Sequence, residues 1–170
     1  MGMIIEESGM KFGPFSDEYC FHIEKSNTYL KLQTGLQMAE FILIQPDQES
    51  LLVVEAKSSS PKPTNNIDFD KYIAEIAEKL MNGFTLGLAI CLGRPGRYSD
   101  EISRCFKEIA HNSVRIKLLL VINGHKDEWL MPINDALKKK LRCISKIWPL
   151  DIVTINETAA RKYHLIQATA

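Results

Sequence analysis

The sequence lacks several patterns that identify common classes of site. No two of its four cysteines stand at the Cys-x-x-Cys spacing of a zinc site or a redox pair. It has no glycine-rich phosphate-binding fingerprint, and its N-terminus carries no basic segment followed by an apolar run. The longest weakly charged stretch, residues 81–93, contains three glycines and is too short to span a bilayer. We therefore expect a cytoplasmic protein that makes no contact with a membrane.

The chain also has no net charge, because 21 basic side chains balance 21 acidic ones. This balance argues against a general polyanion binder. The charges are unevenly distributed, however. Residues 1–93 hold 13 acidic and 7 basic side chains, whereas residues 94–146 hold 6 acidic and 12 basic ones. The second half is compatible with a surface that contacts nucleic acid, although an ordinary solvated surface can have the same composition.

The length and apolar content predict a single α/β domain over residues 1–170. Residues 58–66, rich in Ser, Pro and Asn, separate two elements as a loop. We expect a central mixed β-sheet with an antiparallel hairpin, flanked by helices. The expected strands are residues 40–45, 50–55, 114–122 and 151–155, and the expected helices are residues 68–81, 100–111, 133–147 and 157–165.

Two segments are ambiguous in their apolar pattern. Residues 15–32 suit a helix that ends at Gly35, although Phe21 and Ile23 could also alternate on a strand. We favour the helix. Residues 84–92 either continue the preceding helix or form a buried strand, because glycines interrupt the helical pattern there.

The register of the expected hairpin brings two carboxylates together. If Gln45 and Ser50 close its four-residue turn, Glu40 lies directly opposite Glu55 on the neighbouring strand. Opposed side chains share a face, with Cβ atoms roughly 5 Å apart, and two like charges so placed destabilise a sheet. A bound cation would reverse that penalty, because carboxylate oxygens are natural ligands of Mg²⁺.

A lysine stands on the same face of the second strand. Because strand side chains alternate, Lys57 and Glu55 share a face with Leu51 and Val53. The residues between them are apolar as well, which indicates an interior strand that ends in a charged cluster. The alternative is an ordinary surface ion pair between Glu55 and Lys57, which would contribute little to stability.

These residues resemble a known family. A strand that opens with an acid, a hairpin, and an apolar strand ending in Glu-x-Lys are similar to the metal-binding hairpin of the PD-(D/E)xK nuclease superfamily; here the match is residues 40–43 followed by residues 52–57. The resemblance implies a restriction endonuclease-like core, built as helix, three-stranded meander, helix and strand, over roughly residues 15–122.

The resemblance also implies an activity, the hydrolysis of phosphodiester bonds in DNA or RNA. It implies that Glu40, Glu55 and the carbonyl of Ala56 bind Mg²⁺, for which Mn²⁺ can substitute. Lys57 would position or activate the attacking water. Many members add an acid from their first helix, and Glu24 is the first candidate for that role here.

The sequence departs from the family pattern in ways that leave an alternative open. The first acid is a glutamate, and no proline precedes it. The literal Pro46-Asp47 pair falls in the turn, far from Lys57. Glu18 is the second candidate for the additional acid. The alternative function is a catalytically inactive binding or assembly module that keeps the nuclease fold.

Several basic residues are candidates for weaker contacts with nucleic acid. They lie in the loop after the hairpin, in a Gly-Arg-Pro-Gly-Arg turn and on a basic helix: Lys62, Arg94, Arg97, Lys138 and Lys139. The four histidines form no metal-binding spacing, so we expect each at the surface or at a helix end. A homodimer is compatible with the sequence.

Overall fold

The computed structural model describes residues 2–94, 99–109 and 113–167 and shows an α/β fold. One sheet has five strands in the order β3-β4-β5-β6-β7, and the other pairs β1 with β2. The strands are β1 (Met3–Glu7), β2 (Met10–Phe15), β3 (Cys20–Phe21), β4 (Phe41–Gln45), β5 (Ser50–Lys57), β6 (Arg115–Ile122) and β7 (Asp151–Asn156). The α-helices are α1 (Asn27–Leu32), α2 (Asn66–Cys91), α3 (Arg104–Ile109), α4 (Asp127–Lys140), α5 (Arg142–Ile147) and α6 (Glu157–Lys162).

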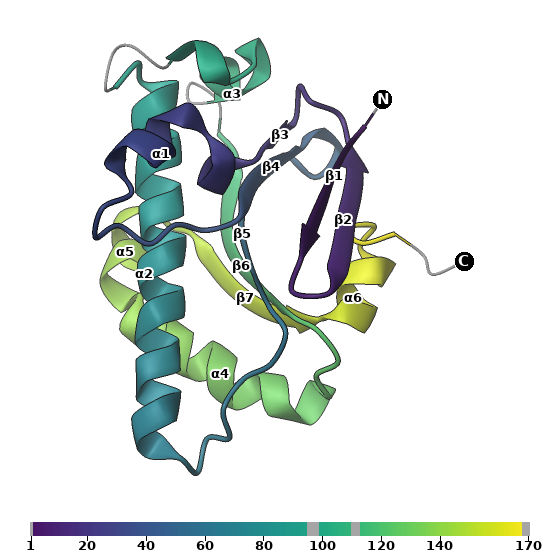
Figure 1. Cartoon of the computed structure of the whole chain (residues 1–170), viewed down its shortest axis with the longest axis vertical. Coiled ribbons are helices and arrows are strands. Elements are labelled where there is room, and N and C mark those ends of the chain that lie inside the picture. Colours follow the sequence, from purple (N-terminus) through teal and green to yellow (C-terminus); the bar gives the residue numbers. More distant parts are fainter. Residues whose placement is uncertain (1, 95–98, 110–112, 168–170) are drawn as a thin grey trace.

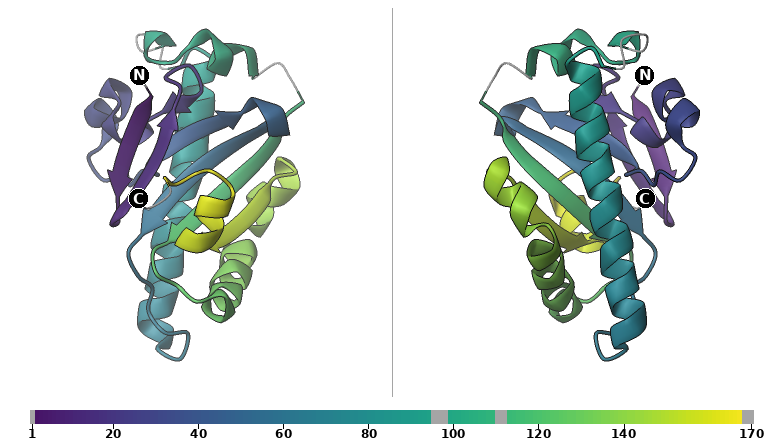
Figure 2. Two further views of the ribbon diagram at one scale, coloured as in Figure 1. Left: turned by 90° about the vertical axis from the view of Figure 1, so that its right-hand side faces the viewer. Right: turned by 90° about the vertical axis from the view of Figure 1, so that its left-hand side faces the viewer.

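The large sheet is mixed, as the sequence predicts. Strands β3, β4 and β5 are antiparallel neighbours, whereas β5, β6 and β7 run parallel. Helices α2 and α4 cover one face, and the β1–β2 hairpin and α6 cover the other (Figure 1). Side views place α4 and α5 on one side of α2, and α1 and the β1–β2 hairpin on the other (Figure 2).

The β4–β5 hairpin has the predicted register. Gln45 pairs with Ser50, and Phe41 pairs with Val54. Glu40 immediately precedes β4, and its backbone N–H donates to the carbonyl of Val54, 2.9 Å away. The regular pairing ends at Phe41 and Val54, and the bond from Glu40 departs from it by one residue, so Glu40 and Glu55 do not form a directly opposed pair of the ladder.

The helix expected over residues 15–32 is mostly wrong. Strand β2 ends at Phe15, β3 covers two residues, and α1 begins only at Asn27. Cys20 is buried in the core on one face of the sheet, and Phe21 in the core on the other. A segment buried on both faces suits a strand. Ser26 then caps α1 by accepting a hydrogen bond from the N–H of Tyr29.

Glycines explain why the apolar pattern of α2 blurs without ending the helix. α2 continues to Cys91, so the helical alternative for residues 84–92 is correct. A Cβ at Gly83 would lie 2.9 Å from Val53 Cγ1, and one at Gly87 would lie 2.3 Å from Ile42 Cδ1. The glycines let the helix approach β4 and β5 closely. The basic helix expected at residues 133–147 instead begins at Asp127 and divides into α4 and α5.

Candidate functional site

Two groups of charged side chains lie near the end of the β4–β5 hairpin that is remote from its turn. We call Glu55, Lys57, Glu75 and Lys79 the Glu55 cluster. Its glutamate and first lysine come from β5, and the other two residues lie one turn apart on α2. We call Glu7, His22, Glu24 and Glu40 the Glu40 cluster. Its members come from β1, from the 3₁₀ turn Ile23–Lys25 with the residue before it, and from the start of β4.

The Glu55 cluster is a network of ion pairs. Lys79 Nζ lies 3.0 Å from Glu55 Oε1, and Lys57 Nζ lies 3.4 Å from the same oxygen. Lys57 Nζ also donates to Glu75 Oε1, 2.8 Å away. The Glu55 side chain is completely buried, and its Oε2 has no hydrogen-bond partner among the described residues. Two ammonium groups thus neutralise one buried carboxylate.

The electrostatics of this cluster follow from burial and pairing. Burial raises the pKa of Glu55, and the charges of Lys79 and Lys57 oppose that rise. Burial alone would lower the pKa of Lys79, but Glu55, together with the charges of Glu40 and Glu24, more than compensates and raises it. The hydrogen bond from Lys57 lowers the pKa of Glu75. Lys79 is therefore held as the charged partner of the buried Glu55.

The Glu40 cluster has a different balance of charge. One ligand atom from each of its four residues lies within 4.8 Å of each of the others. The Glu24 N–H donates to the Glu40 carbonyl across 3.3 Å, which holds these two residues side by side. Only 5% of Glu40 is exposed, and its Oε2 has no hydrogen-bond partner among the described residues. The same is true of His22 Nε2, which is also buried.

Burial and repulsion hold a proton in this cluster. Burial, a hydrogen bond with the Glu24 carboxyl and the charge of Glu55 raise the pKa of Glu40 to about 9. Burial and the charge of Glu24 raise the pKa of Glu7, against the attraction of Lys25, whose Nζ is 3.9 Å away. Burial lowers the pKa of His22, so its imidazole is neutral at neutral pH. Three carboxyl groups thus share one weak cationic partner within 4 Å among the described residues.

The Glu40 cluster fits a divalent cation. Metal–oxygen distances are about 2.0–2.6 Å, so two ligands on opposite sides of one ion lie about 4–5 Å apart. The observed spread of 4.8 Å is compatible with a single ion after small side-chain movements. A neutral imidazole and ionised carboxylates are suitable ligands, and a cation would remove the repulsion that keeps Glu40 protonated.

The remaining expected site residues are distributed differently. The Ala56 carbonyl accepts a hydrogen bond from Ser8 Oγ, 3.1 Å away. Glu18 is exposed and belongs to neither cluster. Lys62 lies in the loop after β5, and Arg97 lies outside the described residues. Arg94 follows the end of α2, roughly 20 Å along the helix from the Glu55 cluster.

The basic helix lies away from the clusters. Lys138 and Lys139 occupy the last turn of α4, across α2 from α1 and the β1–β2 hairpin (Figure 2). Among the described residues, the cations within 4 Å of either cluster are Lys25, Lys57 and Lys79, all from the acidic first half of the chain. The basic excess of residues 94–146 therefore does not neutralise the clusters.

Four cluster residues were missed in the sequence: Glu7, His22, Glu75 and Lys79. Lys79 had a detectable signal, because it stands three residues after Ile76 and seven after Tyr72, within an otherwise apolar helical stripe. His22 lies at the N-terminal end of the 3₁₀ turn Ile23–Lys25, as expected, but nothing in the sequence indicated that its half-buried imidazole joins the Glu40 cluster. The sequence indicated Glu7 only indirectly. The Ser-Gly pair that follows it makes the β1–β2 turn and so places Glu7 at the end of a strand.

Tertiary contacts place Glu7. The neighbouring Ser8 bonds to the Ala56 carbonyl, and Asn123 Nδ2 donates to the Ser8 carbonyl, 3.0 Å away. These bonds fasten the tip of the β1–β2 hairpin to the ends of β5 and β6. Because Glu7 ends β1, it is held beside the residues that precede β4.

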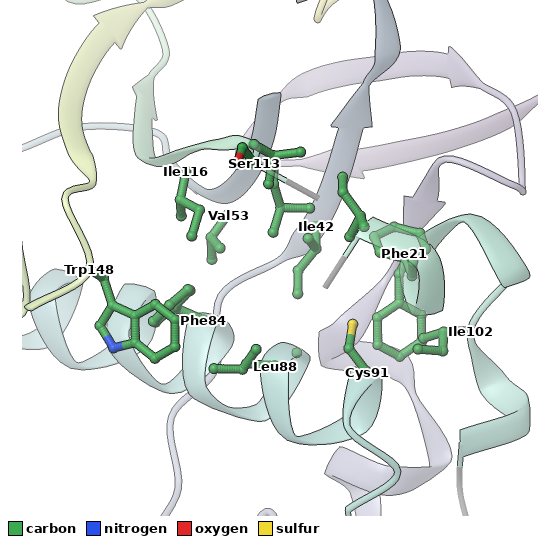
Figure 3. A pocket seen from close by; sticks show the side chains of 15 residues that line it. Phe21, Ile42, Val53, Phe84, Leu88, Cys91, Ile102, Ser113, Ile116 and Trp148 are labelled. Atoms are coloured by element: carbon green, nitrogen blue, oxygen red, sulfur yellow. The ribbon is translucent and has the colours of Figure 1, made fainter. Parts of the chain in front are cut away.

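A separate cavity of about 190 Å³ lies between α2 and the sheet (Figure 3). It is lined mainly by apolar side chains, including Phe84, Ile116 and Trp148, and none of the described residues that line it is charged. It therefore brings no charged side chain to a cation or a phosphate. The charged clusters, rather than this cavity, form the candidate site.

Comparisons with protein-family models, with curated proteins and with solved structures give no match to this chain. Among the helices of the described residues, none is both long enough and apolar enough to cross a membrane.

Proposed function

We propose that this protein is a metal-dependent phosphodiester hydrolase that acts on DNA or RNA. The resemblance of residues 40–43 and 52–57 to the PD-(D/E)xK hairpin supports this proposal. So does the order of elements after Phe15, in which the meander β3–β4–β5 is followed by α2 and then by β6 parallel to β5. A restriction endonuclease-like core has this order, although here a β-hairpin rather than a helix precedes the meander.

The observation that carries the proposal is the Glu40 cluster. Four potential ligand atoms converge within 4.8 Å, and one of them belongs to a buried glutamate with an unpartnered oxygen. Such an arrangement is costly without a cation, because buried like charges raise each other's pKa values. Glu40, Glu24, Glu7 and His22 would hold the ion. When bound, a divalent ion polarises a phosphoryl oxygen and lowers the pKa of bound water.

The lysines of the Glu55 cluster have complementary roles. Lys57 is partly exposed and bonded to the half-exposed Glu75, so its ammonium can hold a phosphate oxygen or orient a water at the same end of the sheet. Lys79 is more deeply buried and holds Glu55 in place. The charge of Glu55 acts on Glu40, and this negative charge favours a cation in the neighbouring cluster.

The ligand types favour Mn²⁺ over Mg²⁺. Carboxylates suit Mg²⁺, Ca²⁺ and Mn²⁺, whereas an imidazole suits transition metals. His22 therefore shifts the preference toward Mn²⁺, with Mg²⁺ as the weaker alternative.

A specific observation favours the alternative of a non-catalytic binding module. Lys79 and Lys57 already neutralise Glu55, and Ser8 already occupies the Ala56 carbonyl. Both groups are expected metal ligands in the family, and both have partners here without a metal. In this alternative the Glu55 cluster is a structural ion-pair network, and the fold serves to bind a partner.

A cleavage assay tests the proposal. Labelled single-stranded and duplex DNA and RNA are incubated with the protein in Mn²⁺, in Mg²⁺ and in EDTA. We expect cleavage that requires metal and is faster in Mn²⁺. Lys57→Ala should lower the rate about 10²–10³-fold, because a charge aimed at the reacting phosphate is lost. It should leave the Mn²⁺-induced thermal stabilisation intact, since Lys57 is not a ligand.

Lys71→Ala, an exposed change on α2, is the matched control and should keep the wild-type rate. Cleavage that persists unchanged in Lys57→Ala would identify a contaminating nuclease. No cleavage by the wild type in any metal would favour the non-catalytic module.

A further inference from the structure

A second pocket adjoins the candidate site at the carboxyl ends of β5 and β6. It has a volume of about 470 Å³ and is lined by the loop residues Ser60, Pro61, Lys62, Pro63 and Thr64 together with His125 and Trp129. The two strand ends are neighbours, since Lys57 pairs with Ile122 and the Asn123 N–H donates to the Lys57 carbonyl, 2.9 Å away. The pocket begins three residues beyond Lys57, within about 10 Å along the chain.

An aromatic ring forms one wall of this pocket. Trp129 is 46% exposed, although large apolar side chains are usually covered. The ring of His125 meets it edge-on, with the two ring centroids 5.4 Å apart. Lys126 Nζ lies 5.2 Å from the centre of the indole ring. These contacts hold the indole in place while leaving part of it open to a ligand.

The rest of the pocket is preformed by short-range bonds. Ser60 Oγ and His125 Nε2 are 2.6 Å apart, which joins the loop to the end of β6. Asn156 Nδ2 donates to the His125 carbonyl and to Asp127 Oδ1. The two prolines restrict the loop further. Little conformational entropy would therefore be lost when a ligand binds.

The charge of the pocket indicates the class of ligand. Lys62 lines it and Lys126 lies at its aromatic wall, whereas none of the described residues that line it is acidic. An exposed aromatic ring flanked by cations suits a nucleobase that stacks on the ring while its phosphates meet the lysines. In a duplex the bases are already stacked on one another, so only an unpaired base can occupy such a wall.

We propose that this pocket, with Trp129 as its stacking wall, is a nucleobase subsite that selects single-stranded nucleic acid next to the candidate site. This inference rests on the proposed function, because it names the substrate class on which the proposed hydrolase would act. The nucleotide beside the scissile phosphate would place its base on Trp129. Lys62 and Lys126 would contact the adjoining backbone.

Binding without metal tests the subsite separately from cleavage. The chain has two tryptophans, so Trp148→Phe leaves Trp129 as the only indole. In EDTA and low salt, a short single-stranded thymidine oligonucleotide should quench its fluorescence in a saturable way. A duplex of equal length should quench it much less.

A second measurement does not depend on the Trp148→Phe variant. Anisotropy of a labelled single strand should show about tenfold weaker binding to Trp129→Ala than to the wild type. Met131→Ala, an exposed change on the same helix, is the control and should bind as the wild type does.

The outcomes separate the two proposals. Equal binding by Trp129→Ala and the wild type, or equal quenching by duplex and single strand, would overturn the subsite while leaving metal-dependent cleavage intact. Trp129-dependent binding of single strands by a protein that cleaves nothing would support the subsite and refute the hydrolase.

Discussion

The two charged clusters occupy the same end of the same sheet, yet they differ in how their charges are satisfied. In the Glu55 cluster, lysines from β5 and α2 lie within 3.4 Å of the buried carboxylate. In the Glu40 cluster, three carboxyl groups and an imidazole converge, and the nearest cation among the described residues is 3.9 Å away from Glu7. The lysines of the protein neutralise the buried carboxylate of the Glu55 cluster, whereas an added cation would be needed to neutralise the Glu40 cluster.

This difference separates a structural role from a binding role. A buried carboxylate paired with lysines stabilises the fold mainly because removing one partner leaves the other unpaired. A buried carboxyl that shares a proton with a second carboxyl can bind a metal ion in place of that proton. We therefore propose that the Glu55 cluster positions the site and that the Glu40 cluster would bind the metal ion.

The largest expected effect comes from breaking the Glu55 cluster. Lys79→Met should lower the free energy of unfolding by about 3 kcal/mol, because it leaves the buried Glu55 with one partly exposed partner. Chemical denaturation monitored by circular dichroism measures the loss. Lys71→Met is the exposed control on the same helix and should change stability by less than about 0.5 kcal/mol.

A second substitution checks the cause of that loss. Adding Glu55→Gln to Lys79→Met should restore part of the stability, since the unpaired buried charge is then removed as well. If the double variant is less stable than Lys79→Met by the full cost of Glu55→Gln alone, the two side chains are not coupled.

A somewhat smaller effect should distinguish the two clusters by their response to metal. If Mn²⁺ is present at about 100 times its dissociation constant, it should stabilise the wild type by about 2.7 kcal/mol. Differential scanning calorimetry should then show a rise in Tm of roughly 5–10 °C. Glu40→Gln should abolish this rise, because a ligand is lost, whereas Glu55→Gln should retain it.

The exposed Glu18→Gln variant is the control for a general effect of charge removal and should respond as the wild type does. If the Mn²⁺-induced rise in Tm disappears in Glu55→Gln as it does in Glu40→Gln, the ion lies between the two clusters, as the family resemblance implies. The assignment of the ion to the Glu40 cluster alone would then be wrong.

The smallest expected effect concerns pH in the absence of metal. The pKa of Glu40 is about 9 in the folded protein and 4.5 as an unperturbed side chain, because burial disfavours its charge. The folded state therefore binds more protons than the unfolded state between these values, and stability should fall as pH rises through this window. Glu40→Gln, which cannot ionise, should lack this component.

The difference is measurable by denaturation at several pH values. The variant and the wild type should be similarly stable near pH 4, where Glu40 is largely protonated in both states. As pH rises toward 9 the variant should become progressively the more stable, by at most about 1.4 kcal/mol per pH unit, since it leaves no buried charge. Parallel pH profiles for the two proteins would show that Glu40 ionises freely and that the cluster holds no proton.

Local sequence determined the hairpin and its charged end. Strand alternation and a four-residue turn predicted the register of the hairpin, and the pairs from Gln45–Ser50 to Phe41–Val54 confirm it. The reason is that hairpin register depends on residues close together in the chain. For the same reason, apolar periodicity predicted the helix over residues 68–81, the first part of α2, but it left residues 84–92 open between helix and strand. The direct opposition of Glu40 and Glu55 is not part of the observed ladder, because the Glu40 N–H bonds to the Val54 carbonyl. The expectation of repulsion between the two glutamates was incomplete, because it did not include Lys79.

Only the tertiary structure decided which groups surround the two glutamates. Glu7 reaches Glu40 because the β1–β2 hairpin docks on the sheet, where Phe12 and Phe41 pack with ring centroids 5.3 Å apart and Ser8 bonds to β5. Lys79 reaches Glu55 because glycines allow α2 to approach β5. These contacts join residues that are distant in the chain, and their geometry depends on how whole elements pack. The periodicity or spacing of residues within a single element therefore does not predict this geometry.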